Sequence, residues 1–112
     1  MTEIVYLYFN DLGMFLEKYI SEIRILCQKN KVKSLYVFGS VLTNKFSDKS
    51  DIDLIVDIDA IDPLDYAENY FNLKFALEEL LNRQIDLLEQ KAIKNPYLME
   101  NIENSKNLLY AF

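Results

Sequence analysis

Two aspartates, Asp51 and Asp53, open an apolar segment and are separated by a single residue. Side chains two positions apart on a β-strand point to the same face of the sheet, so both carboxylates would project together while Ile52, Leu54 and Val56 enter the core. Carboxylates held side by side repel each other unless a cation lies between them. Hard divalent ions such as Mg²⁺ prefer these oxygen ligands and also bind substrate phosphates, so the pair indicates metal-dependent phosphoryl transfer.

A third acid, Asp86, lies inside the apolar segment 84–88 (QIDLL). An acid within a hydrophobic strand is costly unless it is paired or hydrogen-bonded. If this strand neighbours a strand over 51–58, Asp86 completes a triad of carboxylates. We expect it either to hold the catalytic metal or to accept the proton of the attacking hydroxyl.

Gly39 and Ser40 end the short apolar segment 34–38 (SLYVF), and ten residues separate Ser40 from Asp51. Glycine lets the backbone approach a ligand closely, the serine hydroxyl adds a donor, and a helix N-terminus offers free N–H groups to phosphate. The triphosphate of a nucleotide would lie here, beside metal ions at the aspartates. Alone, a Gly-Ser pair is usually a turn and an aspartate before a strand can simply cap a loop. The two elements together favour the functional interpretation.

The composition excludes several other chemistries. The 112 residues carry a formal net charge of -6 and include no histidine, which removes Ser-His-Asp catalysis and most zinc sites. The acidic balance argues against nucleic-acid binding, since that requires Lys and Arg to neutralise phosphates.

The single cysteine, Cys27, falls on an apolar helical stripe and is predicted to be a buried thiol. Because neither a signal peptide nor a membrane-length apolar run is visible, we expect a cytoplasmic protein without membrane contact.

Hydrophobic periodicity predicts the elements that position these residues. A stripe from Phe15 to Cys27 predicts a helix from Asp11 to about Asn30, and segments 34–38, 51–58 and 84–88 read as strands. Residues 3–9 are apolar and aromatic, and a strand, a helix start and a partner-packing arm all stay open for them.

Two further helices have clear starts. Asp62 and Pro63 predict the N-cap and first position of a long helix, and Asn95-Pro96 begins a short one through about Ser105. The apolar stripe of the long helix is predicted to include six residues: Ala67, Tyr70, Phe71, Leu77, Leu80 and Leu81. An apolar tail at 108–110 follows. The order predicts one α+β domain over 1–112, with a small mixed sheet of three or four strands and helices packed on one face.

The combination of Gly39-Ser40, Asp51-x-Asp53 and Asp86 in an apolar strand resembles the polymerase-β-type nucleotidyltransferases. The short length is similar to that of the minimal nucleotidyltransferases of bacteria and archaea, and the resemblance extends to the segment 95–98 and Tyr110. It implies the polymerase-β-type nucleotidyltransferase fold. It also implies that Gly39 and Ser40 contact the nucleotide phosphates, that Asp51 and Asp53 bind two Mg²⁺ ions, and that Asp86 completes the catalytic and metal site.

The resemblance further implies transfer of AMP from ATP to a protein. Many minimal members are antitoxins encoded beside a HEPN-domain toxin and modify a toxin tyrosine, which implies a HEPN partner and a hetero-oligomer. The family often carries an arginine shortly after the serine, as in G-S-x-A-R-G, whereas residues 41–45 here are VLTNK. Lys45 and Lys49 are the candidates to supply that charge, although lysine lacks the bidentate fork of arginine.

Two alternatives stay open. The chain could be a binding module that neutralises its partner by contact alone, with a vestigial nucleotide site; the complete set of acids argues against this. It could also modify a small molecule, as antibiotic-modifying relatives do. Those relatives usually carry an extra acceptor domain, and too few residues follow segment 84–88 to form one.

Overall fold

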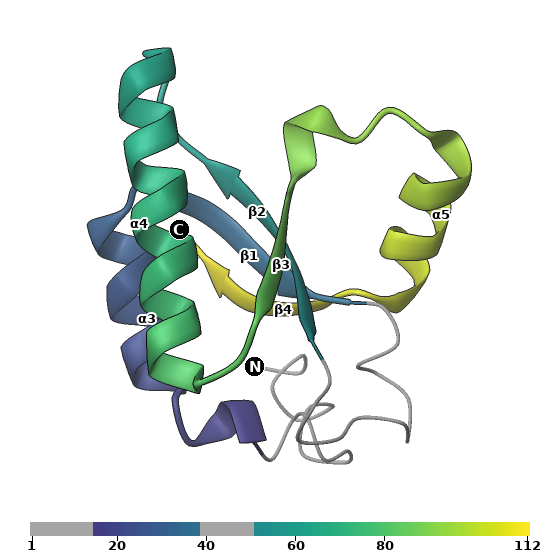
Figure 1. The fold of residues 1–112 in the computed structure, drawn as a ribbon. Coiled ribbons are helices and arrows are strands. Elements are labelled where there is room, and N and C mark those ends of the chain that lie inside the picture. Colours follow the sequence, from purple (N-terminus) through teal and green to yellow (C-terminus); the bar gives the residue numbers. More distant parts are fainter. Residues whose placement is uncertain (1–14, 39–50) are drawn as a thin grey trace.

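The described part of the chain is built around a four-stranded sheet (Figure 1). The structure, a computed structural model, describes residues 15–38 and 51–112. Its strands in sheet order are β3 (Ile85–Glu89), β2 (Ile52–Ile58), β1 (Val32–Val37) and β4 (Asn107–Ala111). The helices are α3 (Ile20–Lys29), α4 (Pro63–Leu81) and α5 (Pro96–Ser105), with a 3-10 turn, η2 (Gln90–Ala92), after β3.

The sheet is mixed, which confirms the predicted α+β class. β1 pairs antiparallel with β2 and with β4, whereas β2 and β3 are parallel. Parallel neighbours need a long crossover connection, and α4 supplies it. The apolar tail predicted at 108–110 is the fourth strand, in which Tyr110 lies opposite Leu35 of β1.

Both faces of the sheet are covered (Figure 1). The larger core lies between the sheet and helices α3 and α4, and Leu54, Val56 and Leu77 are almost fully buried in it. A smaller cluster on the other face joins Ile55 to Ile102 of α5. The prediction placed the helices on one face, but α5 covers the opposite one because alternate residues of β2 are apolar on both sides.

The first predicted helix is interrupted. Residues 11–14 lie outside the described residues; 15–17 are helical, 18–19 form a turn, and α3 begins at Ile20. The apolar stripe is nevertheless where it was expected, with Leu16, Ile23 and Cys27 buried. Burial raises the pKa of the Cys27 thiol to about 12, so this cysteine is a core residue, as predicted.

Helix α4 has the predicted start but a different buried stripe. Asp62 caps it by accepting a hydrogen bond from the Leu64 N–H (3.0 Å), and Pro63 occupies the first position. The buried residues recur every four positions: Asn69, Leu73, Leu77 and Leu81. Phe71 was predicted to belong to this stripe, yet half of it is exposed. Its position, two residues from Asn69 and from Leu73, turns it away from the sheet.

Two side chains of α4 fasten β3 on either side of Asp86. The Glu78 carboxylate accepts hydrogen bonds from the Ile85 N–H (3.2 Å) and from Lys74 Nζ (3.0 Å). The Tyr70 hydroxyl donates to the Leu87 carbonyl at 2.6 Å. The residues before and after Asp86 are therefore tied to the helix that delivers the strand.

No helix within residues 15–38 and 51–112 combines the length and the apolar character that a bilayer crossing would need.

Replacing Glu78 by glutamine should weaken the start of β3. The hydrogen bond from Ile85, and then the bond and charge of Lys74, lower the pKa of Glu78. A carboxylate with a depressed pKa stabilises the fold above its unfolded pKa of about 4.3, and this contribution is lost as the pH falls through the lower folded value. We expect Glu78→Gln to reduce the free energy of unfolding by about 0.5–1 kcal/mol at pH 7 and by less near pH 3.5, measured by urea denaturation.

Glu79→Gln is the matched control, because Glu79 is an exposed neighbour on the same helix. An equal loss of stability in both variants, or a loss that does not shrink at low pH, would contradict the role assigned to Glu78.

Candidate functional site

The parallel pairing of β2 and β3 places Asp53 directly opposite Asp86. Both residues are the second of their strands, and Asp51 precedes β2 immediately. Alternation along β2 directs Ile52 and Leu54 into the larger core and Asp53 to the opposite face. The structure therefore brings two of the predicted acids together at one end of the sheet, with the third at the entrance to the same strand.

The end of β1 lies beside the same point. Val37 pairs with Leu54, and the Phe38 N–H donates to the Asp53 carbonyl at 3.1 Å. Gly39 and Ser40, predicted to bind the nucleotide phosphates, lie outside the described residues, as do Lys45 and Lys49. Phe38, the residue directly before Gly39, is nonetheless hydrogen-bonded to Asp53, so the chain enters the Gly-Ser segment next to the aspartates.

The surroundings of Asp53 disfavour the charged form of its carboxyl group. It is half-buried, whereas Asp51 and Asp86 are exposed. Burial raises the pKa of Asp53 above its usual range, and the negative charges of Asp86 and Asp51 and a hydrogen bond with Asp86 raise it further. A carboxylate in these surroundings favours either a proton or a cation.

The donor set fits a magnesium ion that also binds its substrate. Among the described residues, no group of three or more acids, cysteines or histidines is gathered closely enough to hold a metal alone. Mg²⁺, however, usually takes one or two protein carboxylates and completes its shell with water and substrate phosphates. Asp53 and Asp86 provide such a pair, and Asp51 stands beside it as a further acid.

A cleft of about 590 Å³ opens on the outer side of β3, next to Asp86. We call it the β3 cleft. Tyr70 of α4 lines one part, and Lys94, Asn95 and Leu98 line another. The sequence interpretation missed this cleft. One signal was available, because the hydroxyl of Tyr70 on an otherwise apolar stripe needs a polar partner, and it finds one in β3.

Acids that follow Asp53 in the sequence have structural surroundings. Asp57 is buried within β2, where Lys91 Nζ approaches its Oδ1 at 3.5 Å. Asp62 is the helix cap, and Asp65 pairs with Lys31 at 2.7 Å.

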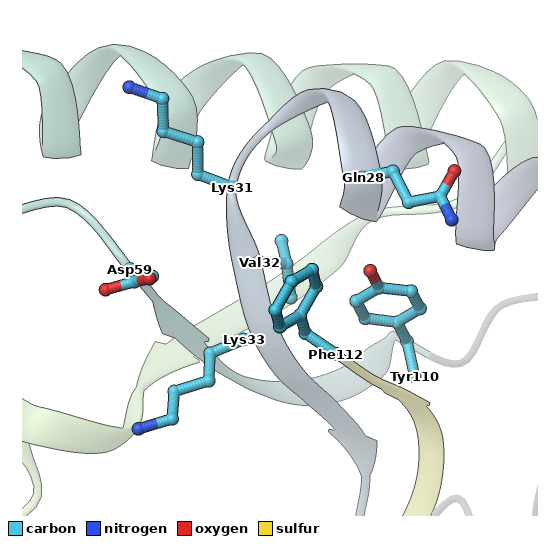
Figure 2. Close-up of a pocket in the computed structure, with 7 residues that line it drawn as sticks. All are labelled: Gln28, Lys31, Val32, Lys33, Asp59, Tyr110 and Phe112. Carbon is cyan, nitrogen blue, oxygen red and sulfur yellow. The ribbon is translucent and has the colours of Figure 1, made fainter.

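A second pocket, of about 610 Å³, lies at the opposite end of β1 (Figure 2). Val32 at the start of β1 and Tyr110 near the end of β4 line it together with Lys31, Lys33 and Phe112. Of the predicted site residues that the structure describes, Asp51, Asp53 and Asp86, none lines this pocket, and Lys31 is engaged by Asp65. Its size alone therefore does not make it the reaction site.

Comparisons with known proteins agree with this geometry. The family model described as "Polymerase beta, Nucleotidyltransferase" matches residues 21–111. A relative from Methanocaldococcus jannaschii, named "Putative protein adenylyltransferase MJ0128", is 41% identical over 87 residues, which cover 78% of this chain and 84% of the relative.

Solved structures show the same fold. The "Structure of putative minimal nucleotidyltransferase" is 29% identical with a TM-score of 0.63, covering 81% of this chain and 89% of that one. A chain in the complex of the tri-AMPylated Shewanella oneidensis HEPN toxin with its MNT antitoxin has a TM-score of 0.58 at 22% identity, covering 86% and 72%. This second likeness supports the fold alone.

The resemblance found in the sequence is thus confirmed by the matched family model, by the relatives and by the fold. The chain belongs to the polymerase-β nucleotidyltransferase family and is a nucleotidyltransferase enzyme.

Proposed function

We propose that this enzyme transfers AMP from ATP to a tyrosine of a HEPN-domain toxin and thereby acts as its antitoxin. The observation that carries the proposal is the pairing of Asp53 with Asp86 beside the end of β1. The names of the relatives support the adenylyl group and a protein acceptor. The AMPylated HEPN toxin in a complex with the same fold supports the class of partner.

The roles proposed for the residues are those that the family resemblance implies. Gly39 and Ser40 would contact the phosphates, and Asp51, Asp53 and Asp86 would hold two Mg²⁺ ions. When bound, Mg²⁺ neutralises triphosphate charge and polarises the phosphoryl group that is transferred. Asp53, flanked by Phe38 on one side and Asp86 on the other, would be the carboxylate shared between nucleotide and acceptor.

The reaction is a displacement at the α-phosphorus of ATP. The tyrosine oxygen forms a bond to that phosphorus while the bond from the α-phosphorus to the bridging oxygen of the β-phosphate breaks, and pyrophosphate leaves with the electron pair. Asp86 is exposed and lines the β3 cleft, and in this proposal it takes the phenolic proton and passes it to solvent.

Asp53→Asn should abolish transfer, because the variant keeps the shape of the side chain and loses its charge. We expect a fall of at least about a hundredfold, the scale of a single preorganised electrostatic group. The measurement is the intact mass of a HEPN-domain protein encoded beside this gene after incubation with the enzyme, Mg²⁺ and each nucleoside triphosphate. Mass increments of AMP with ATP should appear for the wild type only.

Asp59→Asn serves as the control, since Asp59 is exposed just beyond β2 and should leave transfer unchanged. Retained transfer by Asp53→Asn would remove Asp53 from the site. A stable complex without any mass increment, together with protection of cells by Asp53→Asn, would instead establish the contact-only alternative.

Metal binding should be visible in stability as well as activity. In EDTA at neutral pH, burial and the neighbouring acids disfavour the charged form of Asp53, so Asp53→Asn should raise the free energy of unfolding by about 0.5 kcal/mol and Tm by about 2–4 °C. Mg²⁺ with a non-hydrolysable ATP analogue should then raise Tm of the wild type more than that of the variant.

Thermal unfolding followed by circular dichroism tests this expectation, again with Asp59→Asn as the control. A variant that is less stable than the wild type in EDTA would show that Asp53 is held by favourable contacts and not by mutual repulsion.

A further inference from the structure

We propose that the acceptor protein docks across the outer side of β3, with an apolar face against α4 and α5 and its reactive hydroxyl in the β3 cleft. This inference rests on the proposed function and deepens it by assigning the acceptor a surface. Within residues 15–38 and 51–112, β3 is an edge strand of the sheet, and its outer side is flanked by α4 and α5 (Figure 1).

The order of strands separates a nucleotide side from an acceptor side. β2 carries Asp53, and its neighbour β1 leads directly into Gly39-Ser40, the proposed phosphate contact. The attacking and leaving oxygens of a phosphoryl transfer lie roughly in line on opposite sides of the phosphorus. If the pyrophosphate leaves on the β1 side, the acceptor hydroxyl arrives from the β3 side, where Asp86 lines the cleft.

Exposed aromatic rings adjoin this cleft along α4. Phe71 and Phe75 are 50% and 59% exposed, and their rings stack with centroids 5.9 Å apart. Phe71 meets Tyr70 edge-on at 5.0 Å, and Tyr70 lines the cleft. We call Phe71 and Phe75 the aromatic ridge. Two stacked rings that are about half exposed to water are typical of a protein contact surface.

The opposite wall of the cleft is also apolar. Tyr97, Leu98 and Met99, in the first turn of α5, are 78%, 38% and 48% exposed, and Leu98 lines the cleft. Tyr70 of α4 and Leu98 of α5 line the cleft together with Asp86, so the exposed apolar residues of both helices adjoin it. A partner that bridges them would cover the edge strand and exclude water from the reacting atoms.

The charges around these walls favour a different protein over a second copy. Three exposed acids lie near the apolar residues, Glu68 and Glu79 on α4 and Glu100 on α5, whereas the exposed Lys94 lines the cleft itself. The nearby Lys74 is engaged by Glu78 and lies 5.6 Å over the Phe75 ring. Two copies, each with a net charge of -6, would bring like charges together. The acceptor is therefore expected to present an apolar centre with a rim of lysine and arginine.

The test compares Phe71→Ala/Phe75→Ala with Ile25→Ala, in which a half-exposed apolar residue of α3 is removed instead. With a HEPN-domain protein as acceptor, we expect the double variant to raise the acceptor KM and weaken the complex at least tenfold. Affinity for the non-hydrolysable ATP analogue and Tm should stay close to wild type. Leu98→Ser should weaken the complex similarly from the other wall.

Unchanged acceptor affinity in the double variant, or an equal loss in Ile25→Ala, would overturn the proposal. So would a HEPN-domain protein that neither binds the wild type nor is modified by it. Self-association that the double variant abolishes would assign the ridge to a second copy and overturn it too. A complex that depends on Phe71 and Phe75 but shows no transfer would contradict the proposed function and leave the docking surface established.

Discussion

The fold holds two carboxylates close together that would separate in water. Asp53 and Asp86 face each other across a parallel strand pair, and burial of Asp53 adds to the cost of its charge. Hydrogen bonds of the β2–β3 ladder fix the spacing, and Tyr70 and Glu78 of α4 fasten the residues on either side of Asp86. The rest of the domain can be understood as the scaffold that keeps this repulsive pair in register.

That scaffold depends on β2 being apolar on both faces. Leu54 and Val56 anchor the strand to the α3–α4 layer, while Ile55 packs with Phe38 and Ile102 on the other side. A one-residue slip of β2 would turn Asp53 and Asp57 toward the larger core, which is otherwise apolar. The position of Asp53 is consequently determined by its neighbours and not by favourable contacts of its own carboxylate.

Local patterns were sufficient for much of the fold and for the acids of the site. Some patterns depend only on residues that are close together in the sequence, so they can be recognised there directly. These are the D-x-D spacing, the start of the long helix at Asp62-Pro63 and the apolar stripe through Cys27. The roles of Gly39 and Ser40 stay predictions.

Features that depend on distant parts of the chain were harder to predict. The apolar tail at 108–110 forms β4 because it pairs with the free edge of β1. Helix α5 packs on the opposite face of the sheet because Ile55 and Leu88 are apolar there. Periodicity alone could not show that Phe71 faces solvent, since the buried stripe of α4 is set by the sheet it meets. The β3 cleft combines α4, β3 and α5, and no single segment encodes it.

The same geometry has a consequence for the order of binding. Because the described carboxylates do not form a closed cage, a metal ion at Asp53 and Asp86 would be held firmly only when nucleotide phosphates complete its shell. Binding of the metal would then raise the affinity for the nucleotide, and the nucleotide would raise the affinity for the metal by the same factor. Without substrate, the uncompensated charge at Asp53 would persist.

An acceptor that closes over the edge strand would lower the local dielectric and strengthen every charge interaction at once. Docking and chemistry would thus be coupled through the electrostatics of a single residue pair.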